Sequence, residues 1–434
     1  MSPPGPGRET IYALSSGSPP AAIAIIRVSG TQAGDALAAL AGRVPEPRKA
    51  VVAALKHRAN GEVLDRALLL FFPGPNSATG EDVAELHLHG GRSVVSAVLG
   101  ALAGLPGLRE ALPGEFTRRA FQNGRIDLTE AEGLADLLMA ETESQRRAAL
   151  ALAGGALSQV IARWREELLS VAARTEAALD FSDEGDVEGE VSLRDSPALG
   201  KLMLEIRAAL DRPTSERLRE GVRVVIAGPP NTGKSSLLNR LAGRRAAITS
   251  AIAGTTRDVV EAPTAIGGAP FLLIDTAGLR ESEDEVETIG IERARSNLEA
   301  ADLILWLGEP ADCPDRERAI VIRSMADLHS NPSGTDTDIS VSAETGEGMN
   351  ELVELLISRS RVLLPKEGEV KINARHRAAL AECLDHLQEA SRGDDLIISA
   401  EALRLARNTL DRVTGRVGVE DMLDALFGSF CIGK

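Results

Sequence analysis

The sequence predicts a multidomain protein of α/β and all-α parts, in which an α/β domain interrupts an α-helical domain that follows an α+β domain. Residues 1–120 alternate short apolar runs with Pro- and Gly-rich breaks, which is typical of strands joined by turns. Residues 121–218 and 365–434 are rich in Ala, Leu, Glu and Arg at helical spacing. Residues 219–364 alternate strand-like and helix-like segments, so we expect a parallel sheet there.

Composition narrows the classes of protein. At 434 residues and 44% hydrophobic content, the chain is long and apolar enough for about three packed domains. Its net charge of −16 opposes general affinity for nucleic-acid phosphates, and 3% aromatic residues offer few surfaces for base stacking. An RNA partner must therefore meet a local basic patch or be held by a second protein. Three widely spaced cysteines, without a signal segment or a membrane-length apolar run, predict a cytoplasmic protein with no disulfides and no membrane contact.

Three strands and one helix are expected in the N-terminal domain. Residues 21–28, 67–72 and 83–88 are short apolar runs between turns, and Arg92–Ala103 has the spacing of an amphipathic helix. On the third strand, His87 and His89 lie two residues apart and therefore on one face. Because no third ligand cluster lies nearby, packing or hydrogen bonding is favoured over metal binding.

Helical signals dominate on either side of the inserted domain. Residues 129–132, Thr-Glu-Ala-Glu, fit a capping box at the start of a helical pattern that continues to residue 179. An acidic, Gly-containing segment at 182–190 interrupts this pattern before helices resume to about residue 218. The helical texture returns after Pro365.

The inserted domain contains a phosphate-binding pattern. Residues 228–236, Gly-Pro-Pro-Asn-Thr-Gly-Lys-Ser-Ser, fit G-x-x-x-x-G-K-S. A β-branched run at 222–227 precedes them, and Leu237, Leu238 and Leu241 follow at helical spacing. The loop therefore lies between a strand and the start of a helix, which is the context that this P-loop pattern requires.

The residue types in this loop suit a nucleoside triphosphate. Glycines let backbone N–H groups approach phosphate oxygens, and the helix dipole adds positive potential. We expect Lys234 to reach the β- and γ-phosphates and the Ser235 hydroxyl to bind Mg²⁺. The predicted nucleotide contacts in the loop are Asn231, Thr232, Gly233, Lys234, Ser235 and Ser236.

A second buried strand predicts the opposite wall of the phosphate site. Residues 271–278, Phe-Leu-Leu-Ile-Asp-Thr-Ala-Gly, end in an acid that can hold the Mg²⁺ shell and a glycine whose N–H can meet a γ-phosphate. The polar loop at 252–258 offers a second hydroxyl for Mg²⁺. Loops that a γ-phosphate holds and hydrolysis releases form a switch, so a Ras-like P-loop GTPase domain is predicted. The predicted nucleotide contacts at the end of this second strand are Asp275, Thr276, Ala277 and Gly278.

The segments that read the base follow in order but are altered. The sequence after the strand at 319–323 is Ser-Met-Ala-Asp, where GTPases usually have Asn-Lys-x-Asp. Asp327 can accept hydrogen bonds from the guanine N1–H and amino group, which adenine lacks. Met325 could cover the base face, whereas Ser324 is too short to replace asparagine. Ser342 and Ala343 belong to a segment that resembles the last guanine-contacting loop. The hypothesis is guanine selectivity with weakened affinity.

The group that orients the attacking water needs another source in this chain. Many small GTPases carry a glutamine directly after Asp-Thr-Ala-Gly, but here the position is Leu279, which cannot orient water. Because residues 280–287 are rich in carboxylates, a glutamate from this segment is the physical candidate.

Further motifs are spread over nearly the whole chain. In the N-terminal part they are Ala-Ile-Ile-Arg-Val-Ser-Gly at 24–30, Pro-Asn-Ser-Ala-Thr-Gly-Glu-Asp at 75–82, His-Gly-Gly at 89–91, Pro-Gly-Glu-Phe-Thr-Arg-Arg-Ala-Phe at 113–121 and Asp-Leu at 127–128. Later ones are Gly-Thr-Thr-Arg-Asp at 254–258, Asp-Thr-Ala-Gly-Leu-Arg at 275–280 and Phe-Cys-Ile-Gly-Lys at 430–434. Together these motifs resemble the MnmE (TrmE) family of tRNA-modification GTPases.

The resemblance implies an architecture and an activity. The N-terminal domain would resemble folate-binding aminomethyltransferase domains and form a homodimer, and the helical domain would be built from both sides of the inserted G domain. With the FAD-containing partner MnmG, in a heterotetramer or larger complex, the family adds an aminomethyl or carboxymethylaminomethyl group to C5 of the wobble uridine of certain tRNAs. Methylenetetrahydrofolate supplies the carbon, and ammonium or glycine supplies the amine.

The resemblance also implies residue roles. The K⁺ ligands would be the side chains of Asn231 and Thr255 and the carbonyls of Ser250 and Ile252. The Mg²⁺ ligands would be Ser235 and Thr256. All six of these residues would also contact GTP. Glu287 matches the glutamate that activates water, and the catalytic candidates are Lys234, Arg280 and Glu287.

The folate-binding positions that the resemblance implies are Arg27, Glu85, Arg125 and Lys434. Arg125 departs from the usual lysine, which keeps the charge but changes the geometry. Cys431 is either a catalytic thiol or a small packing residue, and both interpretations stay open.

Two other functions fit part of the pattern. A regulatory GTPase acting on RNA or ribosome assembly, with a vestigial N-terminal domain, predicts GTP turnover without folate binding. A stand-alone folate aminomethyltransferase with a degenerate G domain predicts folate binding without GTP turnover. Measurements of folate binding and GTP turnover therefore distinguish the three functional hypotheses.

Overall fold

The computed structural model describes residues 9–180, 193–194, 196–243, 260–275, 295–328, 336–366, 368–393, 395–417, 420–428 and 430–433. By their contacts, the residues divide into two compact units, one of Met1–Ala135 with Thr414–Lys434 and one of Asp136–Val413. The sequence places residues 414–434 with the second helical segment, whereas these contacts place them with the N-terminal unit. The division into four domains otherwise stays a prediction.

A six-stranded sheet forms the centre of the N-terminal unit, in the order β3-β4-β5-β2-β1-β6. Neighbouring strands are antiparallel except β1 and β6, which are parallel. The strands are β1 (Thr10–Leu14), β2 (Ile23–Ser29), β3 (Val51–Lys56), β4 (Val63–Phe72), β5 (Val83–His89) and β6 (Leu108–Glu110). The three expected strands correspond to β2, β4 and β5, and the expected helix to α2, which confirms an α+β domain.

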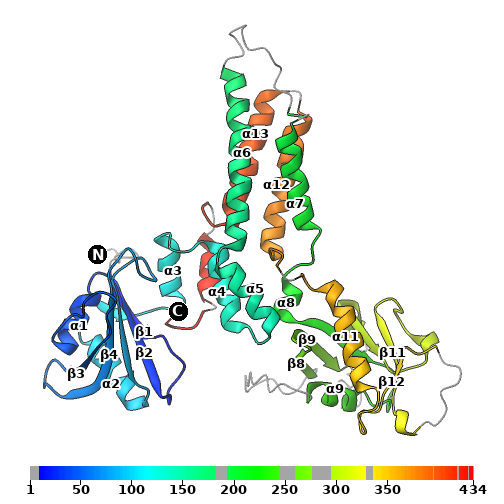
Figure 1. Ribbon diagram of the computed structural model, residues 1–434, viewed down its shortest axis with the longest axis horizontal. Helices are drawn as coiled ribbons and strands as arrows, with labels where there is room; N and C mark the ends of the chain where they lie inside the picture. Colours follow the sequence, from blue (N-terminus) through cyan, green and yellow to red (C-terminus); the bar gives the residue numbers. More distant parts are fainter. Residues whose placement is uncertain are drawn as a thin grey trace, which may run out of the picture. The chain divides into compact units, whose positions relative to one another are not determined.

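Helices cover one face of this sheet and only part of the other. α1 (Ala33–Ala41) and α2 (Arg92–Ala103) pack on one face, where Leu37 and Leu102 join the buried residues of the strands (Figure 1). On the opposite face, Phe116 of α3 (Glu115–Gln122) packs on β1. Elsewhere Ile23 and Val52 are 60% and 59% exposed, so an apolar part of the sheet is open in this chain.

The C-terminal segment completes the N-terminal unit. Phe427 of α14 (Glu420–Gly428) lies 6.4 Å from the ring of Phe121 and 6.1 Å from the ring of Phe430, in a cluster with the start of α4 (Leu128–Met139). Gly433 has φ +97°, and a side-chain carbon added to it would lie 2.0 Å from the carbonyl oxygen of Leu14. Only glycine therefore fits where the C-terminal segment lies against the end of β1.

The capping box that starts α4 is shifted from its predicted position. The prediction placed it at residues 129–132, but the Glu130 N–H donates to Oδ1 of Asp127 (2.9 Å) and the Asp127 N–H donates to Oε2 of Glu130 (2.8 Å). Aspartate serves as a cap as well as threonine does. The helix therefore begins at Leu128, earlier than the Thr-Glu-Ala-Glu pattern indicates.

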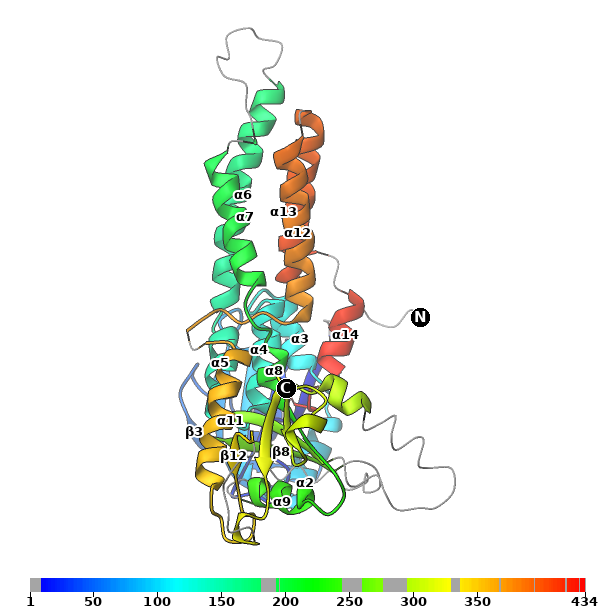
Figure 2. The ribbon, with the colours of Figure 1, turned by 90° about the vertical axis from the view of Figure 1, so that its right-hand side faces the viewer.

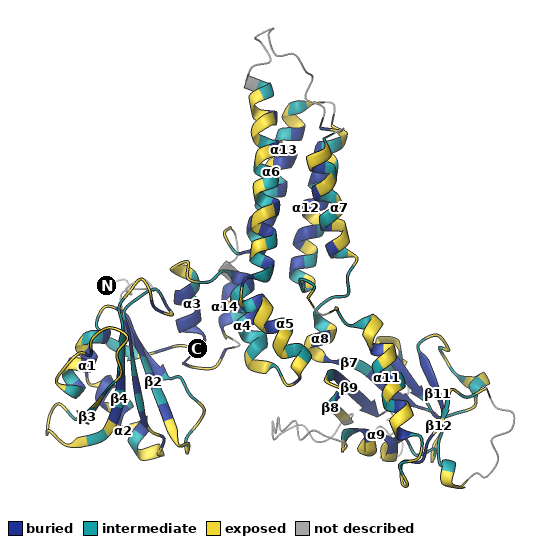
Figure 3. Cartoon of the chain, in the orientation of Figure 1, coloured by how far each residue is buried: buried dark blue, intermediate teal, exposed yellow. Residues whose placement is uncertain are grey.

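The second unit contains a helical bundle. The helices α6, α7, α12 and α13 run side by side (Figures 1 and 2), and their buried faces meet in one apolar core (Figure 3). Their bounds are α6 (Ala156–Asp180), α7 (Pro197–Leu210), α12 (Ala374–Arg392) and α13 (Leu396–Val413), and α5 (Glu143–Ala153) precedes them. The helical pattern predicted on both sides of the inserted domain thus forms one bundle.

A second six-stranded sheet, in the order β12-β11-β10-β7-β9-β8, forms the inserted domain. It is parallel except for β8, which pairs antiparallel with β9. Its elements are α8 (Glu216–Glu220), β7 (Val222–Ala227), α9 (Lys234–Ala242), β8 (Val260–Ile266), β9 (Ala269–Asp275), β10 (Leu303–Trp306), η2 (Pro310–Asp312), β11 (Ala319–Arg323), η3 (Ala326–Leu328), β12 (Ile339–Ser340) and α11 (Met349–Leu363). The leucines predicted on α9 are buried, which confirms the strand–loop–helix context. Across the described part of the chain, the helices are too short or too polar to cross a membrane.

Candidate functional site

The loop between β7 and α9 needs glycine at both ends of its pattern. Gly228 has φ +145°, and an added side-chain carbon would lie 2.9 Å from the backbone of Leu307. Gly233 has φ +85° and precedes the first residue of α9. A side chain at either position would strain the backbone or collide with a neighbouring strand. The two glycines therefore let the loop turn from the end of β7 into the helix.

Lys234 is buried, with its ammonium group turned back over the loop. Nζ donates to the carbonyls of Gly228 (3.1 Å) and Pro229 (2.7 Å). The Thr232 hydroxyl also donates to Pro229 O (2.9 Å). These bonds place a positive charge at the start of α9, where the helix dipole also favours an anion. The predicted phosphate contacts Asn231 and Ser236 belong to this loop and to the first turn of α9.

The two described residues predicted at the Mg²⁺ site lie in contact. β7 and β9 are parallel, with Ile226 opposite Asp275, so both strands end beside the phosphate-binding loop. Ser235 Oγ donates to Oδ2 of Asp275 (2.6 Å), whose side chain is buried. A hydroxyl and a carboxylate are the oxygen donors that Mg²⁺ prefers, so this pair fits the ion.

The altered base-reading segment lies beside the phosphate loop. Met325 has φ +55°, and its Cε lies 3.7 Å from the position of a side-chain carbon added to Gly233. The Ala326 N–H donates to Val341 O (3.1 Å), which joins this segment to the loop that begins with Ser342. Ser342 is fully buried, and Asp327 is exposed. The structure therefore brings Met325, Asp327, Ser342 and Ala343 to the phosphate side of the sheet.

Several predicted site residues lie outside the described residues. They are Ser250, Ile252, Thr255, Thr256, Thr276, Ala277, Gly278, Arg280, Glu287 and Lys434.

The opposite ends of β7 and β9 are held by α5. Ser144 Oγ donates to Gly268 O (2.9 Å) in the turn between β8 and β9, and Gln145 Nε2 donates to Arg219 O (3.1 Å) just before β7. In the same turn, a side-chain carbon added to Gly267 would lie 2.3 Å from Cδ1 of Ile357 on α11. We call the contacts of Ser144 and Gln145 the joint. Both strands therefore run from the joint to the phosphate site.

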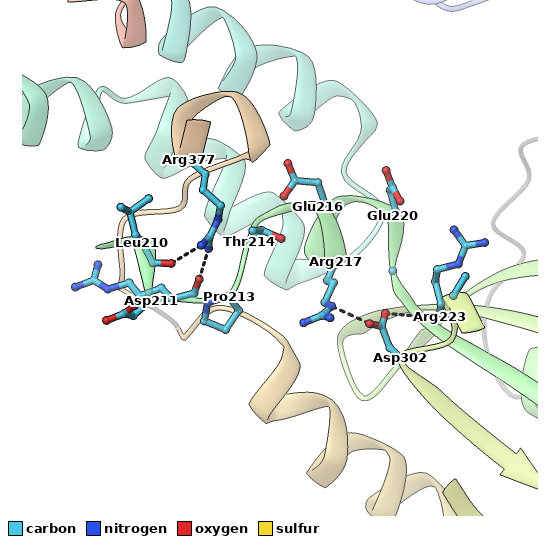
Figure 4. Close-up of a pocket in the computed structure, with 13 residues that line it drawn as sticks. Leu210, Asp211, Pro213, Thr214, Glu216, Arg217, Glu220, Arg223, Asp302 and Arg377 are labelled. Carbon is cyan, nitrogen blue, oxygen red and sulfur yellow. Dashed lines mark hydrogen bonds and ion pairs between the residues drawn. The ribbon is translucent and has the colours of Figure 1, made fainter. Parts of the chain in front are cut away.

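A cavity of about 530 Å³ lies beside the joint, within the same unit (Figure 4). Arg217 Nε lies 2.8 Å from Oδ1 of Asp302, and the Arg223 N–H donates to its Oδ2 (3.0 Å), so α8 and β7 are tied to the start of β10. Arg377 of α12 donates to carbonyls at the end of α7, including Arg212 O (2.6 Å). The charged lining residues are four arginines and four carboxylates: Arg212, Arg217, Arg223, Arg377, Asp211, Glu216, Glu220 and Asp302.

Two of the predicted folate residues form an ion pair across the N-terminal sheet. Arg27 on β2 lies opposite Glu85 on β5, and its Nε and Nη2 donate to Oε1 at 3.1 and 2.9 Å. The guanidinium also lies over the ring of Phe116, 5.9 Å from its centre. His87 Nε2 lies 3.2 Å from the other oxygen, Oε2 of Glu85. The Arg27 side chain is therefore held on two sides.

Arg125, the third described folate candidate, lies beside the loop that contains Gly80. A side-chain carbon added to Gly80 would lie 2.7 Å from Cβ of Asn123 and 3.3 Å from Cγ of Arg125. Asn123 Nδ2 donates to Thr79 O (2.7 Å), which fastens this loop to the turn after α3. Any side chain at position 80 would therefore collide with Asn123 and crowd Arg125. Among the described residues, the structure gives no contact between Arg125 and Arg27 or Glu85. Cys431, the possible thiol, is exposed.

A buried ion-pair network lies beneath this loop. Arg119 contacts Oε2 of Glu81 (3.0 Å) and Oε1 of Glu115 (2.9 Å), and Arg109 also pairs with Glu115 (2.6 Å). Burial raises the pKa of Glu115, but hydrogen bonds from Arg109, the Leu112 N–H and Arg119 outweigh it and lower the pKa to about 2. The network keeps Glu115 ionised and stabilises the start of α3.

Both strand histidines hydrogen-bond to carboxylates, as the sequence interpretation favours. His87 contacts Glu85, and His89 contacts Asp65 through its Nδ1 (2.7 Å) and its backbone N–H (2.9 Å). Among the described residues, no group of three or more His, Cys, Asp or Glu side chains suits a metal ion. The contact to Asp65 is long-range in sequence, so strand periodicity alone could not identify it.

The comparisons with known proteins cover both units. The family "GTP-binding protein TrmE N-terminus" matches residues 10–125, and the family "MnmE helical domain" matches residues 128–431. A protein of Erythrobacter litoralis named tRNA modification GTPase MnmE is 56% identical over 98% of this chain and 100% of its own length. One of Rhizorhabdus wittichii with the same name is 56% identical over 100% of this chain and 98% of its own length. The chain belongs to the MnmE family.

Proposed function

We propose that this chain is a cytoplasmic, K⁺-stimulated GTP hydrolase that works with the FAD-containing partner MnmG. Together they would add an aminomethyl or carboxymethylaminomethyl group to C5 of the wobble uridine of certain tRNAs, using methylenetetrahydrofolate. The contact between Ser235 and Asp275 beneath the phosphate loop is the observation that carries the hydrolase assignment. The family membership supports the tRNA substrate, because the relatives described above are named for tRNA modification.

The phosphate loop supports binding of a nucleoside triphosphate. The Lys234 ammonium can exchange its carbonyl partners for oxygens of the β- and γ-phosphates. Ser235 and Thr256 would hold Mg²⁺, with Asp275 accepting a hydrogen bond from its shell. Bound Mg²⁺ and K⁺ supply positive charge to the phosphate oxygens. Asp327 would accept hydrogen bonds from guanine, with Met325 against the base.

Hydrolysis then depends on residues of the surrounding loops. Glu287 would orient the attacking water, since Leu279 has no group that could do so. Arg280, in the same loop, would contribute positive charge. The K⁺ ion would be held by the Asn231 and Thr255 side chains and the carbonyls of Ser250 and Ile252. The charge of this ion would do the electrostatic work of an arginine finger, and we propose that full turnover also requires two G domains to pair.

The N-terminal unit supports the folate part of the proposal. Arg27, Glu85 and Arg125 supply two positive charges and a hydrogen-bond acceptor, which suit a pterin ring and a glutamate tail. Lys434 would add a third positive charge. The thiol of Cys431 is a candidate to take part in the reaction. The open apolar sheet face, with Ile23 and Val52 exposed, supports association of two copies through this domain.

The joint supports a link between hydrolysis and the remainder of the chain. The strands that end at the phosphate site begin at hydrogen bonds with α5, so a movement of the switch loops has a path to the helix that precedes the bundle. We propose that nucleotide turnover rearranges the folate site against the flavin of MnmG through this connection.

Mass spectrometry of tRNA nucleosides from cells that lack this protein tests the proposal. The expected result is loss of the C5 modification at the wobble uridine and its return when the wild-type chain is supplied. Intact modification in the deletion strain would refute the assignment. Loss of modification together with no folate binding by the purified protein would instead favour a regulatory GTPase.

A further inference from the structure

His87 lies on the open side of the N-terminal sheet next to Glu85. Along β5, Ala84, Leu86 and Leu88 are buried, whereas the residues between them point to the opposite face. The side chains of Glu85 and His87 are 16% and 26% exposed, so both are accessible and neither is free to move widely.

The two oxygens of Glu85 have different hydrogen-bonding capacity. Oε1 receives two N–H groups from Arg27, at 3.1 and 2.9 Å, whereas Oε2 contacts His87 Nε2 at 3.2 Å. A carboxylate offers about four lone-pair sites, two on each oxygen. Oε1 is therefore saturated, and Oε2 is the oxygen that can still accept a hydrogen bond. Because a carboxylate is only an acceptor, the His87 nitrogen that faces it must carry the proton.

The surroundings of His87 leave the contact with Glu85 as its main polar interaction. In register with His87 lie Ile25 on β2 and Leu68 on β4, both apolar. The equivalent histidine two residues later, His89, is paired with Asp65. Among the residues that the structure describes, the polar contact of the imidazole is the one to Oε2, and its register partners on both neighbouring strands are apolar, which is the geometry of a group that fixes a carboxylate.

We propose that His87 is a positioning residue of the folate site. By donating from Nε2 to Oε2 of Glu85, it orients the one oxygen that can accept an N–H from the aminopyrimidine edge of the pterin. Arg27 fixes the other oxygen from β2. This inference rests on the proposed folate binding and assigns His87 a part in it.

Three variants of the full chain test the proposal by titration with tetrahydrofolate under anaerobic conditions. His87→Leu removes the donor and is expected to raise the Kd about five- to tenfold, the size of one ordinary hydrogen bond, because the lost bond holds Glu85 and does not itself contact the ligand. His87→Gln retains an N–H donor and is expected to stay within about twofold of the wild type. His89→Gln, on the same strand and face but paired with Asp65, is the matched control and is expected to change the Kd by less than about twofold. GTP turnover and thermal unfolding of each variant report whether it is folded.

The outcomes separate this inference from the function on which it rests. If the wild type shows no saturable binding of tetrahydrofolate, the folate proposal and the role of His87 both fall. If the wild type binds and His87→Leu binds equally well, only the role of His87 is overturned. If His87→Gln weakens binding as much as His87→Leu, the side chain acts through its shape and the hydrogen-bond role is wrong.

Discussion

Individual side chains at the phosphate site are held by hydrogen bonds that a nucleotide can take over. Lys234 donates to two loop carbonyls, and Ser235 donates to Asp275. The sequence predicts this neighbourhood well because the pattern is local and its flanking strand and helix are unambiguous. It could not place the Met325 side chain beside Gly233, because that placement depends on a positive φ in a segment that departs from the usual motif.

Asp327 should determine which base is accepted. Its carboxylate would accept hydrogen bonds from N1–H and the 2-amino group of guanine, and an amide would place a donor there instead. Asp327→Asn is therefore expected to raise the Kd for GTP by about 100-fold and to improve binding of xanthosine triphosphate, whose C2 oxygen accepts. Competition binding with the two nucleotides measures both effects. An unchanged GTP affinity would contradict the assignment of this loop.

Glu115 should make the N-terminal unit sensitive to acid. Its pKa of about 2 lies below the value of about 4.3 for an exposed glutamate, so its ionisation stabilises the fold above pH ~4.3 and this contribution is lost as the pH falls toward 2. Glu115→Gln is expected to lower the free energy of unfolding at pH 7 by about 1–2 kcal/mol, allowing for solvent screening. The difference from the wild type should shrink between pH ~4.3 and 2.

Thermal unfolding at several pH values measures this difference. The control is Glu143→Gln, because Glu143 pairs with Arg146 and Arg147 at the surface. Exposed pairs contribute little to stability, so this variant should unfold as the wild type does. If the difference in free energy of unfolding between Glu115→Gln and the wild type is as large at pH 2 as at pH 7, the assigned pKa is wrong.

At the scale of whole elements, β7 and β9 connect two sites that are far apart in sequence. Their first residues follow backbone groups held by Ser144 and Gln145, and their last residues adjoin the phosphate loop and Asp275. Strands within a paired sheet change length little, so a displacement at one end is passed to the other. The joint is therefore suited to transmit the nucleotide state to the bundle.

Ser144→Ala should weaken this transmission without changing the chemistry. The variant removes the hydrogen bond to Gly268 O but no group at the phosphate site. We expect intrinsic GTP turnover within about twofold of the wild type and tRNA modification in a reconstituted assay lowered about three- to tenfold, the range for one lost hydrogen bond. Ser358→Ala, an exposed serine on α11, is the control. Equal modification by both variants would remove the joint from the mechanism.

Elements could be predicted from the sequence where the signal is local. β2, β4, β5, α2 and the β7–α9 unit follow their apolar periodicity closely. β1, β3 and β6 were not predicted, because short strands of mixed polarity depend on their neighbours. The capping box at Asp127 shows the same limit, since several acids and a threonine compete for the cap position.

At the scale of the whole chain, long-range contacts are what the sequence predicts least. Residues 414–434 have the same helical texture as the bundle, but the ring of Phe427 packs on Phe121 and the unit they join is the N-terminal one. Helical periodicity identifies an apolar face and does not identify its partner. Periodicity therefore predicts the inserted α/β domain and the helical segments on both sides of it, but not which unit the last of these segments joins.

Potassium should act on the whole assembly through the phosphate loop. GTP turnover measured in KCl and in NaCl at equal ionic strength is expected to be about 10- to 100-fold faster in KCl and to rise with protein concentration as G domains pair. Asn231→Ala should lose the preference for KCl, whereas Asn239→Ala, on the exposed side of α9, should retain it. Equal rates in the two salts for the wild type would contradict the proposed K⁺ site.

The charged lining of the cavity beside the joint bears on how such salt experiments are interpreted. Its four arginines and four carboxylates sum to zero formal charge. A surface with no net charge gathers little ion atmosphere, so opening or closing it releases few counterions. Ionic strength by itself should then act here only by screening individual pairs such as Arg217 with Asp302. A difference between KCl and NaCl at equal ionic strength would instead report on the phosphate loop.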